Sequence, residues 1–213
     1  FISPRTRNTY VDQLEDEVNI FFEGGYLLRA PKLKGRAVFY YHQQQDGIDT
    51  YSFYYDLERN FVNIALSNID QRSLGGEFAL QAEVYPGLSI SGVEAIGQHI
   101  YTSRQSADIT VDNSAEVVAE DQTIYSKNFF VAGMPQMAST IGINYRSPKY
   151  WFASVNFNYF DRIFIDFNQV RRTEEALDLI EPGTELYTQT IEQQQVNGQF
   201  TMDLFAGASW KLD

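Results

Sequence analysis

The chain has 213 residues, of which 44% are hydrophobic and 15% are aromatic, including 14 Tyr and 16 Phe. This composition excludes general disorder and favours β structure and interfaces. A formal net charge of −12 argues against nucleic acid as a partner, because phosphate binding needs clustered Lys and Arg. Cysteine is absent, and His42 and His99 lie far apart without other metal ligands around them, so we expect no disulfide, metal or cofactor.

Alternation of apolar and polar residues with period two divides the chain into about seven strands. The clearest run extends from Leu74 to Val84, where the even positions are apolar and Gln81 and Glu83 lie on the polar face. In the next run a phase slip near Gly92 fits a β-bulge. The predicted strands are residues 16–30, 35–46, 66–86, 87–104, 136–147, 149–161 and 198–212.

The stretch 150–160 has two unlike faces. Its odd positions are apolar and carry Trp151 and Tyr159 at the two ends, whereas Ser154, Asn156 and Asn158 form a polar row. About 9–11 residues of tilted strand cross a bilayer, and large amphipathic aromatics mark the interfaces of such strands. We therefore predict an aromatic girdle of Trp151, Tyr159 and, in the last strand, Trp210. A core strand of a soluble sandwich has the same pattern, so this stretch alone leaves both alternatives open.

The connections between strands alternate between short and long. Short turns at residues 31–35, 86–87 and 147–149 alternate with polar segments at 46–65, 105–133 and 162–197. Soluble domains rarely contain loops beyond about 12–15 residues, whereas outer-membrane barrels combine short periplasmic turns with long extracellular loops. We predict an all-β fold, a segment of a transmembrane antiparallel β-barrel. Seven strands with open edges are expected to be a piece of a larger barrel.

Several stretches together resemble the C-terminal part of the barrel of TonB-dependent outer-membrane receptors of the Bacteroidetes type. These are residues 3–10, 23–26, 35–36, 75–78, 112–116, 144–151 and 158–161. The resemblance implies a Gram-negative outer-membrane transporter of 22 strands with an N-terminal plug domain and a TonB box. We expect the plug domain, the TonB box and the final strands to lie outside this chain. The resemblance also implies active import of a nutrient such as a glycan, a siderophore or a metal chelate. The implied partners are outer-membrane lipid, the TonB complex through those N-terminal segments and a small-molecule or oligosaccharide ligand, while a surface lipoprotein stays an open question.

Two groups of side chains are candidates for function. The residues expected to face the barrel lumen, where the resemblance implies contact with the plug, are Glu77, Gln81, Glu83, Ser154, Asn156, Asn158 and Asp203. Aromatic and basic residues of the long segments are candidates for ligand contact or, as an equal alternative, for pinning the loops together: Tyr51, Tyr54, Tyr55, Tyr125, Phe129, Arg171 and Arg172.

Catalysis has no support in the sequence, which lacks a nucleophile motif and a phosphate-binding loop, so we expect no enzyme activity. The alternative to the transporter is a soluble β-sandwich that binds carbohydrate through aromatic loops. The two hypotheses differ in what covers the apolar rows of the strands, which is lipid in a barrel and a second sheet in a sandwich.

Overall fold

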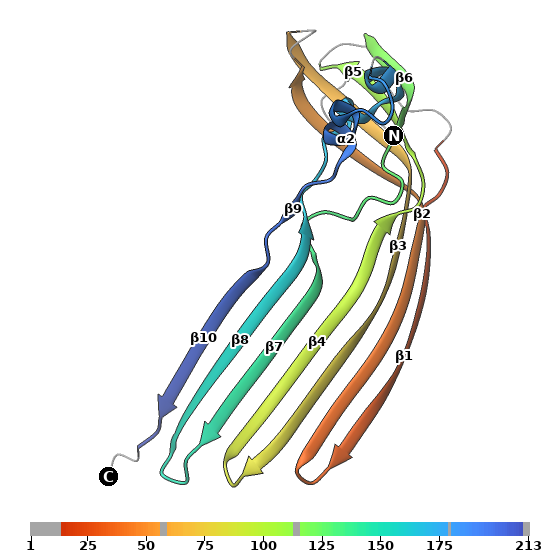
Figure 1. Ribbon diagram of the computed structural model, residues 1–213. Coiled ribbons are helices and arrows are strands. Elements are labelled where there is room, and N and C mark those ends of the chain that lie inside the picture. The colour runs from red at the N-terminus through yellow and green to blue at the C-terminus, as the bar shows by residue number, and fades with distance from the viewer. Residues whose placement is uncertain (1–13, 56–58, 113–115, 179, 211–213) are drawn as a thin grey trace.

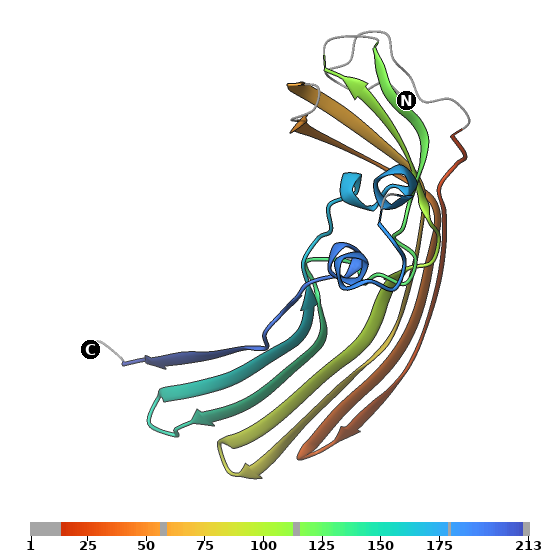
Figure 2. The same ribbon diagram turned by 45° about the horizontal axis from the view of Figure 1, so that its top comes forward.

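The computed structural model describes residues 14–55, 59–112, 116–178 and 180–210. One antiparallel sheet dominates it, and its main path follows the order β1-β2-β3-β4-β7-β8-β10, so that each strand pairs with the next strand of the path along the chain. The sheet curves into a trough rather than lying flat (Figures 1 and 2). The strands of the path are β1 (Val18–Ala30), β2 (Leu33–Tyr55), β3 (Asn60–Tyr85), β4 (Leu88–Tyr101), β7 (Pro135–Arg146), β8 (Trp151–Phe164) and β10 (Gln199–Ala208).

This topology confirms the prediction of sequential antiparallel neighbours. All ten described strands belong to the one sheet, and no second sheet packs against its apolar face within those parts of the chain. A sandwich needs such a second sheet, so the soluble alternative has no support in the architecture. Among the described residues, no helix combines the length and apolarity needed to cross a membrane.

The strand registers place one continuous apolar row across the sheet. Directly opposed residues of antiparallel strands share a face, and Phe157, for example, lies between Ile141 of β7 and Met202 of β10. Ile141 and Met202 are exposed, because nothing described covers them, and Phe157 between them is half-buried. The large exposed members of the row include Phe22, Tyr26, Phe39, Leu74, Phe78, Leu80, Ile90, Ile96, Ile141, Ile143, Tyr159, Phe200, Met202 and Leu204.

The short turns gather at one end of the sheet and the long connections at the other (Figure 1). Residues Pro31-Lys32 and Pro86-Gly87 each form a two-residue link, and Gly87 has a φ of 80°, which glycine adopts without strain. In the third short turn, the amide of Ser147 donates to the carbonyl of Trp151 at 2.8 Å. This segregation agrees with the predicted alternation of short and long connections.

The long connections are folded, which corrects the prediction that they are loops. β2 and β3 continue through residues 46–65 as a hairpin that extends beyond the other strands. Register shifts lie between Gln44 and Asp49, and Asp46 and Asn68 have positive φ angles of 56° and 54°. Such irregularities interrupt period-two alternation while pairing continues, so the sequence pattern ends before the strand does.

The other two long segments carry structure of their own. β5 (Gln105–Val111) and β6 (Val117–Ile124) form a hairpin that pairs with the upper part of β3. Residues 162–197 contain η1 (Val170–Arg172), α1 (Glu174–Asp178), α2 (Glu185–Ile191) and β9 (Gln195–Val196), and the helices lie on the concave face of the sheet (Figure 2). We call the β2/β3 extension, β5, β6 and these helical elements the loop cap.

The loop cap holds the buried apolar cluster of the chain. Ile64 of β3 and Ile124 of β6 are 1% and 0% exposed, and Phe167, in the segment before η1, closes the cluster from the concave face. The remaining buried members are Val62, Leu66, Ile69, Ala107 and Ile109. The cap is therefore packed as a small soluble core is packed, in contrast to the exposed apolar row of the strands.

β4 has a different register from the expected one. Its pairing with β3 is unbroken from Tyr101 to Ser89, so the bulge predicted near Gly92 is absent and the one irregularity of this pair lies between Glu83 and Tyr85. As a consequence Glu94 lies on the apolar face, opposite Phe78 and Ser139. The hydroxyl of Ser139 donates a hydrogen bond to the Glu94 carboxylate, which explains how an acidic residue interrupts the apolar row without a change of register.

Candidate functional site

The seven residues expected to face the lumen share one face of the sheet. Asn156 of β8 is opposed by Gly142 of β7 on one side and Asp203 of β10 on the other. A hollow of about 650 Å³ lies on this face and is lined from β2 across to β10, including Gln81 and Ser154. A hollow that spans so many strands lies on the concave side of a curved sheet. The polar row is on the same face as the hollow and therefore lines the inside of the trough.

A hydrogen-bonded ladder crosses three strands of this polar face. The amide nitrogen of Asn158 donates to Asp203 Oδ2 at 2.7 Å and to Thr201 Oγ1 at 3.2 Å. Thr140 Oγ1 of β7 donates to Asn158 Oδ1 at 2.8 Å. The ladder fixes the Asn158 amide and leaves Asp203 as an acceptor on the concave surface. Such a wall can hold a polar surface or a polar ligand through hydrogen bonds.

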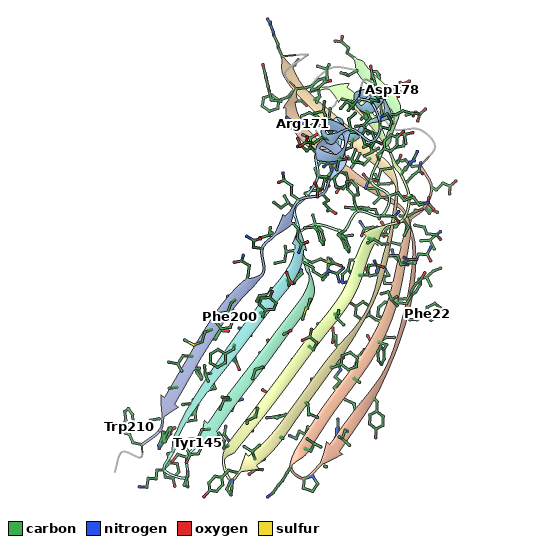
Figure 3. All side chains as sticks on the ribbon, viewed as in Figure 1. Phe22, Tyr145, Arg171, Asp178, Phe200 and Trp210 are labelled. Carbon is green, nitrogen blue, oxygen red and sulfur yellow. The ribbon has the colours of Figure 1, made fainter. Side chains whose placement is uncertain are left out.

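The three girdle residues lie towards the two ends of the strands. Trp151 begins β8 directly after a short turn, and its ring lies 5.0 Å from that of Tyr145. Figure 3 shows Tyr145 and Trp210 together at the short-turn end, and Trp210 is 76% exposed. Tyr159, opposite Phe200 and Ser139, lies nearer the loop cap.

A cavity of about 350 Å³ opens in the loop cap beside α2. Its polar wall combines Asp166 and Asn168 with Gln189 and Thr190 of α2, and Arg171 is exposed at its edge (Figure 3). Phe167 and Leu186 add apolar surface. Carboxylate, amide, hydroxyl and guanidinium groups thus surround one small hollow, an arrangement that can bind a polar molecule by several hydrogen bonds.

Arg172 serves the packing of this cavity wall, unlike its exposed neighbour Arg171. It is 7% exposed, and its terminal nitrogens donate to the carbonyls of Asn168 at 3.2 Å and Glu192 at 3.0 Å. Its guanidinium also lies 5.5 Å from the rings of Phe129 and Phe167. Burial, and then the neighbouring Arg171, lower the pKa of Arg172, while Asp166 opposes that shift. Arg172 and Phe129 therefore hold the cap together.

The predicted tyrosines are dispersed through the cap. Tyr55 packs against the buried cluster, and Tyr54 stacks edge-on against Phe61 with centroids 5.5 Å apart. Tyr125 lies beneath the Arg104 guanidinium at 4.4 Å. Tyr51 donates to Asp49 at 2.7 Å, and burial followed by this hydrogen bond raises the pKa of its hydroxyl. The structure does not bring these four side chains together into one aromatic platform.

Two structural residues of the cap were missed in the sequence. The side-chain Nε2 of Gln193 donates to the backbone carbonyl of Phe130 at 2.6 Å, and its Oε1 accepts from the backbone N–H of Phe130 at 2.8 Å. The side chain thus pairs with Phe130 as the backbone of a neighbouring strand would. Tyr101 packs edge-on against Phe167, and burial, with smaller contributions from Asp166 and Asp49, raises the pKa of Tyr101 to about 12. Gln193 lies in a Gln-rich run that gives no local signal for this role.

Within the described ranges, no group of three His, Cys, Asp or Glu side chains is arranged to hold a metal ion. No family model matches the chain, and no curated protein matches it. A solved structure, the copper transporter OprC, is similar with a TM-score of 0.57 and 16% sequence identity over 95% of this chain. The chain covers 25% of the length of that protein. This likeness shows the fold, which is an all-β segment of an antiparallel β-barrel.

Proposed function

We propose that this chain is part of the wall of an outer-membrane barrel that imports a nutrient, of the TonB-dependent type. The observation that carries the proposal is the exposed apolar row, which runs across the seven strands on the main path of a single curved sheet. Phe22 near one edge and Leu204 near the other are 66% and 74% exposed. A water-soluble protein rarely exposes so long an apolar face to solvent, whereas lipid covers such a face in a membrane barrel.

The open edges support a larger assembly. Within the described chain β1 pairs with β2 alone and β10 pairs with β8 alone, so their outer edges present unpaired backbone. A membrane does not tolerate open edges, so we expect further strands to complete the barrel. In this orientation the short turns face the periplasm and the loop cap faces the exterior.

The loop cap is the proposed entry site for the nutrient. Its cavity beside α2 offers amide, hydroxyl, carboxylate and guanidinium groups, which suit a glycan or a siderophore. The name of the similar structure, a copper transporter, adds copper or a copper chelate to the candidate cargoes. Energy coupling through the TonB complex, and a surface lipoprotein above the cap, belong to the same proposal.

Alternate labelling along β8 tests the membrane part of this proposal. Single cysteines at residues 153–158 of the full-length protein carry a fluorophore in vesicles that contain lipids brominated on the acyl chains. We expect strong quenching at Ala153, Val155 and Phe157 and weak quenching at Ser154, Asn156 and Asn158. Quenching that does not alternate would contradict the barrel.

Uptake measurements test the transport part. Cells that lack this protein are grown with glycans, siderophore-bound iron or copper as the limiting nutrient, and the gene is then restored. We expect growth on one nutrient class to depend on the protein and to be lost when the TonB complex is disabled. Restored growth that persists without TonB would leave a passive barrel and refute the energy coupling.

A further inference from the structure

One acidic side chain interrupts the face that the proposed barrel turns towards lipid. Glu94 of β4 lies in the apolar row, opposite Phe78 of β3 and Ser139 of β7, and it is half-buried. The other acidic residues of the β3/β4 hairpin below the cap, Glu77 and Glu83, lie on the concave face. Glu94 is therefore the acidic residue of this hairpin that the strand register places against lipid.

Glu94 lies well inside the part of β4 that would span the membrane. Leu88, the first residue of β4, is opposite Tyr145, whose ring lies 5.0 Å from that of Trp151 in the girdle. Glu94 is six positions after Leu88, a rise of about 16 Å at roughly 3.4 Å per residue and about 40° of strand tilt. The apolar band of an outer-membrane barrel is about 25 Å tall. Lipid headgroups on either side are therefore too far away to contact this carboxyl group.

The described part of the chain supplies one hydrogen-bond donor to the Glu94 carboxyl group. Ser139 Oγ donates to Glu94 Oε2, and Glu94 forms no other hydrogen bond or ion pair with a described residue. A carboxylate accepts about four hydrogen bonds. On this face of the described strands the one basic residue is Arg72, six positions from Phe78 along β3 and thus about 20 Å away. Because acyl chains carry no donors, lipid leaves most of the acceptor capacity of Glu94 unsatisfied.

The surface beside Glu94 leaves room for a partner. Gly92, the next residue of β4 on this face, is exposed, and a methyl carbon placed there would meet nothing within 4 Å. Leu80 and Ile141, on the two sides of Gly92, are 53% and 58% exposed. Small residues at contacts within a membrane let a second backbone approach closely. A second polypeptide can therefore reach Glu94 across an apolar and uncrowded surface.

We propose that Glu94 anchors a lateral contact with a second membrane-spanning protein, which places a Lys or Arg side chain against this carboxyl group. The inference rests on the proposed barrel and adds a partner in the plane of the membrane. Charge complementarity indicates the partner, because ionisable residues within membranes are almost always paired and the described strands hold no cation within reach. A second copy docked through the same face would set one Glu94 against another, so the partner is a different polypeptide.

Photo-crosslinking in living cells tests whether a protein covers this site. The photoreactive residue p-benzoylphenylalanine replaces Phe78, which is 41% exposed opposite Glu94, in the full-length protein. The matched control carries the same probe at Leu204, which is 74% exposed on β10, three strands along the sheet from β4. The proposal expects one discrete protein adduct from position 78 that the control does not form. Mass spectrometry of the adduct should identify a membrane-spanning segment that contains Lys or Arg.

Substitutions at the pair show whether the carboxyl group is responsible for the contact. Glu94→Leu extends the apolar row, so we expect an assembled barrel by heat-modifiable migration and at least about a tenfold loss of the adduct, equivalent to roughly 1.4 kcal/mol. Ser139→Ala removes the donor within the chain and leaves Glu94 to the partner, so the adduct should persist. If Glu94→Leu does not assemble, Glu94→Gln retains the size of the side chain, removes its charge and should lower the adduct in the same direction.

The outcomes separate this inference from the barrel itself. No adduct, an adduct with lipid alone or an adduct with a second copy of this chain would each overturn the proposal. A protein adduct that is equally strong without the Glu94 carboxyl group, or equally lost in Ser139→Ala, would overturn it as well. The quenching pattern of β8 is read independently. Alternating quenching without a Glu94-dependent adduct rejects the partner alone, whereas quenching that does not alternate rejects the barrel.

Discussion

Adjacent residues of β8 should respond in opposite ways to the same cation. Phe157 lies on the apolar row between Ile141 and Met202, and its ring stacks on Phe200 at 6.2 Å. Asn156 lies on the concave face, opposite Asp203. We predict that Phe157→Arg destabilises the assembled barrel and that Asn156→Arg does not.

The expected cost follows from the position of Phe157, six residues from the short turn that precedes β8. A basic side chain on the lipid face near the bilayer midplane costs about 2–4 kcal/mol, which lowers the folded-to-unfolded ratio about 30- to 700-fold. Asn156→Arg instead places a cation across from the Asp203 carboxylate, a cross-strand pair worth roughly 0.2–1 kcal/mol in the favourable direction. The difference between the two variants is therefore expected to be at least about 2 kcal/mol.

Guanidinium unfolding of the full-length protein in lipid vesicles measures this difference, and heat-modifiable migration on gels reports assembly. Phe157→Leu is the control, because it removes the aromatic contact with Phe200 and adds no charge. Equal destabilisation by the two arginine variants, or folding of the protein as a monomer without detergent or lipid, would refute the assignment of the two faces.

Three further predictions concern the cap and the sheet. Ile64→Ala truncates a residue that is 1% exposed and should cost about 2–5 kcal/mol of stability, seen as faster amide exchange in β5 and β6 without loss of barrel assembly. Exchange in the variant that stays as slow as in the unmodified protein would contradict a packed cap. The raised pKa of Tyr101 means that its contribution to stability is present below about pH 10 and is lost as the pH rises towards about 12. The difference in tyrosinate absorbance between the unmodified protein and Tyr101→Phe should show this titration, and a titration of Tyr101 near the ordinary tyrosine pKa would contradict the prediction. Gly75→Ala would place its methyl carbon 2.6 Å from Tyr40 Cζ and 2.8 Å from the Ile96 carbonyl oxygen, whereas the methyl carbon of Gly24→Ala meets nothing within 4 Å. We therefore expect Gly75→Ala, but not Gly24→Ala, to lower stability by about 1–3 kcal/mol, and equal stability of the two variants would contradict this.

The alternation of apolar and polar residues in the sequence predicts most of the strands of the sheet. Residues 16–30 and 149–161 were predicted within two or three residues of β1 and β8, because each has one face against an apolar environment and one against polar groups. The continuation of β3 was missed although Val62, Ile64 and Leu66 alternate with Asn63 and Ala65. Both runs have their apolar residues at even positions, but Asn68 and Asp70 are polar and Ile69 is apolar at an odd position, so the alternation is interrupted between the two runs where Asn68 has a positive φ.

The candidate ligand residues were harder to predict, because their surroundings come from distant segments. Phe129 and Arg172 are polar-loop residues by sequence position, yet Phe167 places both in the packed wall of the cap. No local pattern distinguishes buried Arg172 from exposed Arg171, since the difference arises from the carbonyls of Asn168 and Glu192. The structure thus favours a role in holding the loops together for Phe129 and Arg172. Arg171 lines the cap cavity and remains a candidate for ligand contact.

Glu94 shows why period two alone cannot assign a face to β4. Val93 and Ala95 make the odd row appear apolar around Glu94, so the sequence favours a bulge that turns the acid inward. The unbroken register keeps Ile90 and Ile96 on the apolar face instead, with Glu94 between them. A regular strand that keeps Ile90 and Ile96 on the apolar face and satisfies the Glu94 carboxylate through Ser139 avoids the local loss of ladder hydrogen bonds that a bulge entails. The hydrogen bond to a neighbouring strand, which the sequence cannot show, is what makes the regular strand the favourable solution.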